Sequence, residues 1–210
     1  MTTPLRPGLQ LRVFESETFE FDPAFRRARR VALDVSSWIE HVPGWLSQND
    51  VLFDELARLA HWEQRTRWMY TKVIEEPRLT AEFPRLAEAP SAVVRRIGAA
   101  LSAHYGVEYD SAWLNLYRDH RDSTSWHADK PPSRGEQAIV PVLSLGETRR
   151  FVIRPKSGGR SSSFVVCGGD LIVMGGRCQR DFEHAVPKEL TPAGTRISVN
   201  FGSSSQSQQA

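Results

Sequence analysis

Short apolar stretches separated by glycine turns fill the second half of the chain. The stretches are WLNLYR, AIVPVLSL, RRFVIR, SFVVC, DLIVM and TRISVNF, and the turns contain Gly146, Gly158-Gly159, Gly168-Gly169 and Gly175-Gly176. Short stretches rich in β-branched and aromatic residues and bounded by glycine turns are typical of strands. Several such strands in succession predict a sandwich or barrel over residues 109–202.

The first half, to about residue 108, has a mixed and partly helical pattern. Three segments carry helical signals: AFRRARRVALD after Asp22-Pro23, VLFDELARLAHW after Asn49-Asp50, and SAVVRRIGAALSAHYG after Pro90. Polar or proline residues at the start and a glycine at the end are common helix boundaries. Residues 65–83 are expected to be extended. Helices that precede a run of strands predict an α+β fold in which the helices support one sheet.

The composition is that of an ordinary globular chain. Of the 210 residues, 40% are hydrophobic and 25% are charged, which fits one domain with a sizeable core. We therefore expect a single domain over residues 1–202, with helical support in about 1–108, the strand core in 109–202, and a disordered tail at 203–210. The net charge of +2 neither requires nor excludes a nucleic-acid partner.

Several protein classes are disfavoured by the sequence. The first residues, MTTPLRPGLQLRVF, contain no apolar core of a secretory signal. No stretch reaches the roughly 18 apolar residues of a membrane span. Cys167 and Cys178 are too few for a disulfide framework, and we assign them no chemistry. We expect a cytoplasmic protein without a membrane partner, and the oligomeric state is left open.

The sharpest chemical signal is Trp126-His127-Ala128-Asp129. Side chains at i and i+2 of an extended segment point to the same side, so His127 and Asp129 can converge on one point. An imidazole and a carboxylate are two of the three ligands of a 2-His-1-carboxylate Fe(II) site, which keeps metal positions open. His184, in GGRCQRDFEHAVP, is the candidate third ligand. Taken alone, each motif is equally compatible with a packed or surface histidine.

The last predicted strand, residues 195–201, has two different faces. Arg196, Ser198 and Asn200 share one face, and Ile197, Val199 and Phe201 share the other. An arginine on a buried polar face needs an anionic partner, and a guanidinium binds carboxylates with two parallel hydrogen bonds. That partner is either a dicarboxylate ligand or a protein Asp or Glu, and the pattern favours neither.

The strand WLNLYR repeats this arrangement. Asn115 and Tyr117 share one face and offer neutral hydrogen-bonding groups suited to carboxylate oxygens. An ordinary half-buried strand has the same alternation, so this strand supports a ligand site only together with the other motifs.

Together these motifs resemble the AlkB family of Fe(II)/2-oxoglutarate-dependent dioxygenases, as a divergent bacterial-type member. The resemblance covers roughly residues 62–202. The matching segments, in the family's order and spacing, are NLYRDHRDSTSWHAD, LSLGETRRFVIR, GGDLIVMGGRCQRDFEHAVP and RISVNF. The resemblance implies a double-stranded β-helix (jelly-roll) core, with a substrate lid within about residues 1–108.

The resemblance also implies the site residues and the reaction. The implied residues are His127, Asp129 and His184 for Fe(II), and Asn115, Tyr117, Arg196 and Ser198 for 2-oxoglutarate. Arg196 would take the distal carboxylate of 2-oxoglutarate. With O₂ as the second substrate, the family converts 2-oxoglutarate to succinate and CO₂ and hydroxylates a C–H bond. In nucleic-acid members that carbon is an N-methyl group on a damaged base, and the product releases formaldehyde.

Three departures from the family pattern lie on the substrate side of the implied site. Many repair members follow the HxD motif with acidic residues that face the base, where this chain has Lys130-Pro131-Pro132. Many members carry a second arginine six residues after the first, where this chain has Gly202. The segment PRLTAEF resembles the start of the substrate lid, but residues 82–84 replace its aromatic and glycine end. These departures bear on the substrate rather than on the iron.

Aromatic and basic residues are interleaved between residues 61 and 78. The candidates for contact with a single-stranded or flipped base are Trp62, Trp68, Tyr70 and Arg78. Such interleaving suits base stacking combined with phosphate contacts. Core aromatics beside a solvated basic face would give the same pattern, and this alternative also applies to the arginine cluster at residues 26–30.

Three functions follow from this reading. The leading one is oxidative dealkylation of N-alkylated nucleic-acid bases. The second is a 2-oxoglutarate-dependent hydroxylase or demethylase of a protein or small molecule, which the departures favour. The third is a non-catalytic binding protein on the same fold, against which the intact triad and Arg196 argue. An open basic groove would favour the first, and a closed apolar pocket of metabolite size the second.

Overall fold

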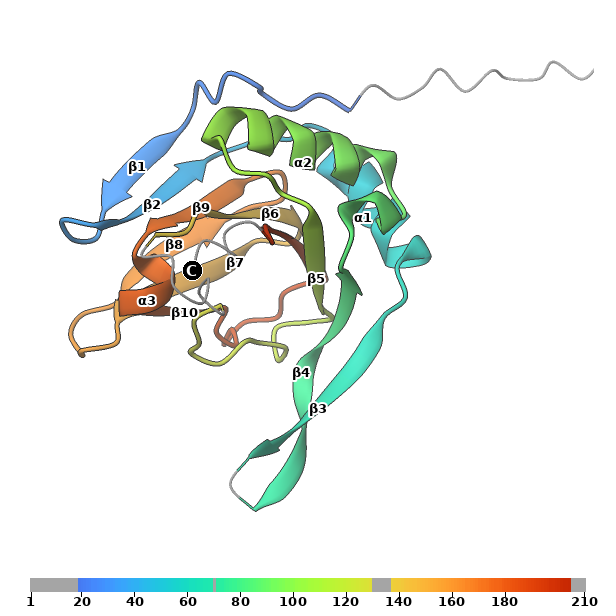
Figure 1. Cartoon of the computed structure of the whole chain (residues 1–210). Coiled ribbons are helices and arrows are strands. Elements are labelled where there is room, and N and C mark those ends of the chain that lie inside the picture. Colours follow the sequence, from blue (N-terminus) through green and yellow to red (C-terminus); the bar gives the residue numbers. More distant parts are fainter. Residues whose placement is uncertain (1–18, 70, 130–136, 205–210) are drawn as a thin grey trace, which may run out of the picture.

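Two antiparallel β-sheets face each other, and helices cover the outer face of the larger sheet (Figure 1). The computed structural model describes residues 19–69, 71–129 and 137–204. The larger sheet contains, in spatial order, β1 (Arg29–Ala32), β2 (Ser37–Val42), β9 (Leu171–Gly176), β6 (Val140–Gly146), β11 (Arg196–Gly202), β5 (Ser111–Tyr117), β4 (Lys72–Phe83) and β3 (Glu63–Met69). The smaller sheet contains β10 (Phe182–Ala185), β7 (Arg149–Pro155) and β8 (Ser162–Val166). This arrangement confirms the predicted α+β fold with a jelly-roll core.

Two of the three predicted helices form. They are α1 (Asn49–Leu59) and α2 (Ala92–Tyr105), and the short helices η1 (Leu86–Glu88) and α3 (Cys178–Asp181) accompany them. At the start of α2 the hydroxyl of Ser91 accepts a hydrogen bond from the backbone N–H of Val93 at 3.1 Å. At its end Gly106 adopts a left-handed conformation with φ 67°, which a residue without Cβ adopts at little cost.

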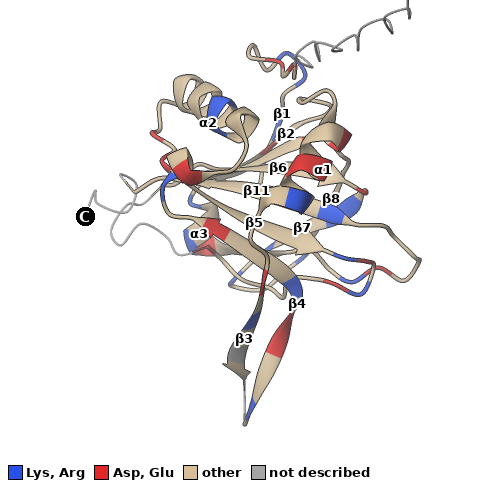
Figure 2. Ribbon diagram, turned by 90° about the vertical axis from the view of Figure 1, so that its right-hand side faces the viewer, with Lys and Arg blue, Asp and Glu red and all other residues tan. Residues whose placement is uncertain are grey.

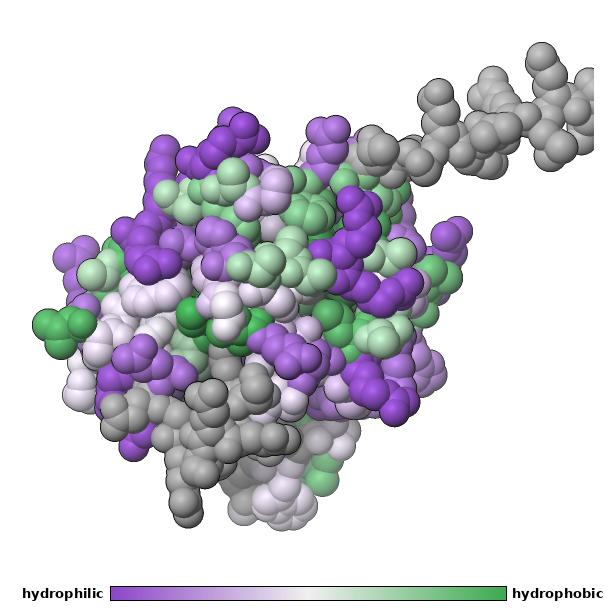
Figure 3. All heavy atoms as spheres, turned by 45° about the horizontal axis from the view of Figure 1, so that its top comes forward, coloured by the Kyte–Doolittle hydropathy of each residue, from purple (hydrophilic) through white to green (hydrophobic). Residues whose placement is uncertain are grey.

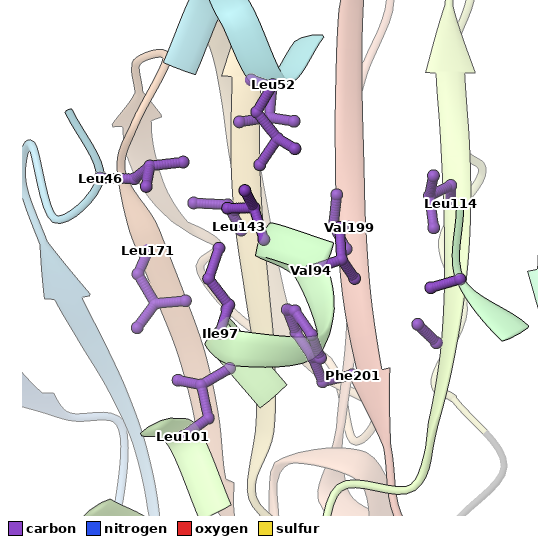
Figure 4. Packing of buried hydrophobic residues seen from close by; sticks show 14 of the residues in the cluster. Leu46, Leu52, Val94, Ile97, Leu101, Leu114, Leu143, Leu171, Val199 and Phe201 are labelled. Carbon is purple, nitrogen blue, oxygen red and sulfur yellow. The ribbon is translucent and has the colours of Figure 1, made fainter. Parts of the chain in front are cut away.

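The larger sheet separates two hydrophobic cores. On β9, Leu171 and Val173 pack under the helices, whereas Ile172 and Met174 point between the sheets. Figure 4 shows Ile97 of α2 close to Leu171 on the helix-covered face. Each fully buried side chain of this size contributes about 1.5–3 kcal/mol. The period-two alternation of the strands therefore places one face of the sheet on the helices and leaves the other for the interior between the sheets.

The helix predicted for residues 24–34 is wrong. The carboxylate of Asp22 accepts hydrogen bonds from the backbone N–H groups of Ala24 and Arg26, at 3.1 and 2.8 Å, which closes a turn. The Phe25 ring is buried and lies 3.6 Å from the His104 ring, centroid to centroid. The chain then forms the exposed edge strand β1, antiparallel to β2. Burial of Phe25 and pairing with β2 override the helical propensity of the arginine-rich segment.

Strands β3 and β4 form a hairpin at the edge of the larger sheet, and its outer part extends beyond the other strands (Figure 1). Its outer part exposes Trp68 and Val73, which face each other across the hairpin and are 69% and 60% exposed. Figure 2 shows basic and acidic residues along the same hairpin. The hairpin confirms the prediction that residues 65–83 are extended. It also places strands in the first half of the chain, for which the sequence predicted mainly supporting helices.

Some predictions lie outside the described residues: Tyr70, Lys130-Pro131-Pro132 and residues 205–210 of the predicted tail. These predictions, the domain bounds and the cytoplasmic location stay predictions. Within the described part of the chain, no helix has the length and apolar character needed to span a membrane. On the face seen in Figure 3, hydrophobic residues are interspersed with hydrophilic ones, which is ordinary for a protein surface.

Candidate metal centre

Backbone pairing brings His127 and His184 together. The N–H of His127 donates to the carbonyl of His184 at 3.0 Å, and the N–H of His184 donates to the carbonyl of His127 at 2.7 Å. This antiparallel bridge links the segment after β5 to strand β10. The two imidazole centroids lie 4.3 Å apart. Residues far apart in the sequence thus present two imidazoles to one point.

Asp129 completes a group of three ligand side chains. Its Oδ1 lies 3.8 Å from Nε2 of His127, and its Oδ2 lies 3.7 Å from Nε2 of His184. The ligand atoms of all three residues lie within 4.8 Å of one another. Two imidazoles and one carboxylate are the donor set of non-haem Fe(II) oxygenases. The three predicted ligands are therefore adjacent in space and fit a divalent transition metal.

Surrounding groups prepare these side chains for a cation. Nδ1 of His127 lies 2.8 Å from the carbonyl oxygen of Ser125, and donation to that carbonyl leaves Nε2 free to bind a metal. Burial holds the pKa of the His184 imidazole well below its ordinary value, which keeps the ring neutral. Burial also raises the pKa of the Asp129 carboxyl, against the opposing effect of His127. A bound cation would favour the ionised carboxylate.

Arg196 is a buried cation for which the described residues offer no carboxylate partner. The residue is 2% exposed. Its Nε donates to the hydroxyl of Ser144 at 2.9 Å, and its guanidinium carbon lies 5.2 Å from the ring centroid of Tyr117. Its Nη1 has no hydrogen-bond partner among the described residues. Because an unpaired buried charge is costly, this environment fits an anionic ligand. The sequence left open whether Arg196 binds a dicarboxylate ligand or a protein Asp or Glu, and this environment favours the dicarboxylate.

A narrow cavity joins Arg196 to the metal ligands. Its volume is about 30 Å³, and it is lined by Trp113, Asn115, Tyr117, Thr124, His127, Asp129, Val142, Phe151, His184, Val186, Arg196, Ser198 and Asn200. All four residues predicted for 2-oxoglutarate line this cavity.

The predicted substrate residues occupy different environments. Arg78 donates from Nε to Oδ1 of Asn115 at 3.0 Å, so it lies beside the narrow cavity. Trp62 packs against the core under the helices and donates from its indole N–H to the carbonyl of Ala57 at 3.2 Å. Trp68 is exposed on β3. The structure therefore brings Arg78 to the site, gives Trp62 a packing role, and leaves Trp68 on the projecting hairpin.

The sequence pattern missed two groups that hold the site in shape. Gln179, on α3, accepts a hydrogen bond at Oε1 from the backbone N–H of Asp129 at 2.9 Å. Arg149, on β7, is 1% exposed, and its guanidinium carbon lies 5.4 Å from the Tyr117 ring centroid. In the strand RRFVIR, Arg149 lies on the same face as Phe151. This alternation could have identified Arg149 as a residue that faces the interior. No comparable signal marks Gln179.

Comparison with known proteins agrees with this site. A family model described as the 2OG-Fe(II) oxygenase superfamily matches residues 46–201. The alkB homolog 3 protein of Bos taurus, named as an alpha-ketoglutarate-dependent dioxygenase, is 33% identical over 181 residues. The alignment covers 76% of this chain but 63% of that protein, so the chain spans less than two thirds of this relative. The Arabidopsis thaliana protein named DNA oxidative demethylase ALKBH2 is 29% identical over 143 residues, which are 57% of this chain and 43% of that protein.

The solved structure of OsALKBH1 has a TM-score of 0.59 at 13% identity, covering 83% of this chain and 100% of that chain. At this identity the likeness shows the fold alone, and it agrees with the jelly-roll core. The sequence relatives confirm the predicted resemblance to AlkB proteins. From the family match over residues 46–201, the chain belongs to the 2OG-Fe(II) oxygenase superfamily.

Proposed function

We propose that the chain is an Fe(II)- and 2-oxoglutarate-dependent dioxygenase that removes alkyl groups from nucleic-acid bases. One observation carries the proposal. Three side chains that can hold a metal line the same narrow cavity as a buried guanidinium whose Nη1 has no partner within the described part of the chain. Metal ligands at one end and a cation at the other suit a diacid that chelates the metal and ends in a second carboxylate.

Each group has a defined task in this reading. His127, Asp129 and His184 hold the metal, and Arg196 binds the distal carboxylate of 2-oxoglutarate. When bound, Fe(II) with 2-oxoglutarate and O₂ supplies the oxidation, which yields succinate, CO₂ and a hydroxylated alkyl group that is lost as formaldehyde. The hydroxyl of Ser198 accepts a hydrogen bond from Nδ2 of Asn115 at 3.3 Å, which keeps both side chains on the cavity wall.

The nucleic-acid substrate is supported by the relatives and by the hairpin. One relative is named a DNA oxidative demethylase. The outer part of the hairpin extends beyond the other strands of the larger sheet and exposes Trp68, an aromatic ring that can stack on a base. Arg78, on the same hairpin, reaches Asn115 in the cavity wall. The hairpin therefore runs from an exposed aromatic ring to the co-substrate cavity, which suits a single-stranded or flipped-out substrate.

The test measures two products in one reaction. Purified protein, loaded anaerobically with Fe(II), receives 2-oxoglutarate and O₂, with single-stranded DNA or RNA that is either methylated or unmodified. The proposal expects succinate together with formaldehyde, and formaldehyde only with the methylated strand. Succinate without formaldehyde from any methylated strand would replace it with a hydroxylase of a protein or small molecule. Bound iron without either product would replace it with a non-catalytic binding protein.

A further inference from the structure

Arg154, on β7, contacts the residue that precedes each of the two histidine ligands. Its guanidinium carbon lies over the ring of Trp126, 4.1 Å from the ring centroid, and Trp126 precedes His127. Its Nε donates to Oε1 of Glu183 at 2.6 Å, and its Nη2 lies 2.5 Å from the same oxygen. Glu183 precedes His184 on β10. One guanidinium therefore joins the two segments that carry the imidazoles.

This contact lies on the face of the smaller sheet that points away from the metal centre. In the pairing of β10 with β7, Glu183 lies opposite Arg154, and His184 lies opposite Ile153. Ile153 packs in the core between the sheets, and successive side chains of a strand point to opposite faces. The side chains of Arg154 and Glu183 are accordingly 40% and 24% exposed. Arg154 does not line the narrow cavity, so its influence on the metal ligands passes through the residues that it contacts.

The segment that carries His127 is joined to β10 by an isolated bridge rather than by a continuous strand ladder. A further backbone hydrogen bond runs from the N–H of Thr124 to the carbonyl of Val186 at 2.9 Å. The side chain of His127 is 37% exposed, whereas that of His184 is 9% exposed. Packing therefore holds His184 more firmly than His127. The position of His127 depends more strongly on the contacts of its own segment.

The two contacts of Arg154 together require a planar cation. A guanidinium can lie flat on an aromatic ring while the N–H groups at its edge bind a carboxylate. A lysine ammonium at residue 154 could pair with Glu183, but it has no flat group to place on Trp126. The half-buried indole of Trp126 is thus held against β7 by a contact that arginine provides and lysine does not.

We propose that Arg154 is a positioning residue of the metal centre. By stacking on Trp126 and pairing with Glu183, it holds the segment of His127 against β10 and so keeps the two imidazoles at the spacing that a metal ion needs. This inference rests on the proposed function, because it concerns the same metal site.

The test is anaerobic titration with Co(II), because the visible absorption of bound Co(II) reports the geometry of its ligands. Arg154→Met should weaken Co(II) binding about three- to tenfold, as expected for the loss of a partly exposed cation–π contact and its ion pair. It should also change the spectrum of the bound ion. Arg154→Lys, which keeps the charge and the ion pair, should have a smaller effect in the same direction.

Arg150→Met is the matched control. Arg150 lies on the same face of β7 as Arg154, its side chain is 46% exposed, and it pairs with Glu189 at 3.0 Å. Glu189 is not adjacent to a metal ligand in the sequence. Thermal unfolding of the metal-free proteins should show similar losses of stability for Arg150→Met and Arg154→Met. Only Arg154→Met should change the Co(II) affinity and spectrum, and equal changes in both variants would refute the inference.

A double-mutant cycle with Trp126→Leu separates positioning from a change of charge. Removal of a positive charge would by itself strengthen the binding of a cation, so weaker Co(II) binding by Arg154→Met requires another cause. If Arg154 acts through Trp126, the two single variants should each weaken binding, and the double variant should bind about as well as the weaker of them. Losses that add in the double variant would refute this coupling.

Failure of this inference can be distinguished from failure of the proposed function, because Co(II) binding is measured without turnover. A wild type that binds Co(II) and forms no formaldehyde would refute the proposed function alone, provided that Arg154→Met weakens binding as expected. A wild type that demethylates with Fe(II), together with an Arg154→Met protein that matches its Co(II) affinity and spectrum, would refute only the inference.

Discussion

Two buried arginines lie against Tyr117, and the structure predicts opposite effects of replacing them. Arg149 donates from its Nη atoms to the carbonyls of Asp119, Asp122 and Pro187, at 3.1, 2.7 and 2.7 Å. Arg196 donates from Nε to Ser144, and its Nη1 has no partner among the described residues. Nε of Arg149 also has no hydrogen-bond partner among the described residues, but its Nη atoms bind three backbone carbonyls. We therefore expect Arg149 to stabilise the fold and Arg196 to serve a ligand. Methionine, an unbranched apolar side chain, is the matched replacement at both positions.

The two substitutions should change the stability of the fold in different directions. Arg149→Met leaves three backbone carbonyls without these donors, and at about 1 kcal/mol or more for each buried acceptor left unsatisfied the total cost is about 3–5 kcal/mol. Arg196→Met removes a buried charge, one of whose donors has no partner in the described ranges, and replacement of buried charged groups by apolar ones is often neutral or stabilising by about 1–4 kcal/mol. For a chain of this size, each 1 kcal/mol shifts Tm by about 2–4 °C. We expect a Tm lower by about 10 °C for Arg149→Met, and an unchanged or higher Tm for ligand-free Arg196→Met.

The assay is thermal unfolding of the metal-loaded proteins with and without 2-oxoglutarate under anaerobic conditions. A ligand at 100 times its Kd stabilises the folded state by about 2.7 kcal/mol. Wild type and Arg149→Met should both gain this increment, whereas Arg196→Met should gain none. An Arg196→Met protein that loses as much stability as Arg149→Met and still responds to 2-oxoglutarate would refute the assignment of Arg196 to the ligand.

Three further predictions concern the metal ligand Asp129, the buried carboxylate of Asp170 and the packing at Gly175. Asp129→Ala should abolish iron-dependent succinate release, and ordinary release would remove the proposed metal site. Burial raises the pKa of Asp170, but hydrogen bonds led by that from His41 at 2.9 Å outweigh it, so the net pKa is lowered. Asp170→Asn should lower the free energy of unfolding by about 1–3 kcal/mol at neutral pH. A carboxylate whose pKa is lowered by folding stabilises the protein fully above its unfolded pKa, and this stabilisation is lost as the pH falls through its folded pKa. Urea titrations should therefore show the difference between wild type and Asp170→Asn shrinking below about pH 4, and a difference independent of pH would contradict this. A Cβ atom at Gly175 would lie 2.0 Å from Cζ2 of Trp38, so Gly175→Ala should lower the urea midpoint by an amount equivalent to about 1–3 kcal/mol, and an unchanged midpoint would be inconsistent with this packing.

The sequence predicted the positions of the candidate site residues better than the elements that support them. Alternation along β5 and β11 correctly separated the polar residues facing the interior from Leu114 and Val199, which pack under the helices. This succeeds because period two is a local property of a strand. The joint position of His127 and His184 depends on a backbone bridge between distant segments, which motif spacing indicated only through the family resemblance.

The elements that the sequence did not predict depend on contacts with distant parts of the chain. Residues 24–34 have helical propensity, but Phe25 is buried in the core and the following residues pair with β2, so tertiary contacts decide their conformation. Strand β10 has four residues and no extended alternation, and its pairing with β7 defines it. The local sequence of such a segment does not specify which strand it pairs with, so neither β1 nor β10 could be predicted from it.

The proposed metal centre is tested by anaerobic Fe(II) binding in equilibrium dialysis, measured for wild type, His127→Ala and Asp119→Ala. Asp119 is the control, because it belongs to the same connection after β5 but pairs with Arg121 at 2.7 Å at the surface. We expect one Fe(II) per chain for wild type and Asp119→Ala, and a large loss of Fe(II) affinity for His127→Ala. Equal affinity of all three proteins would contradict the proposed metal centre.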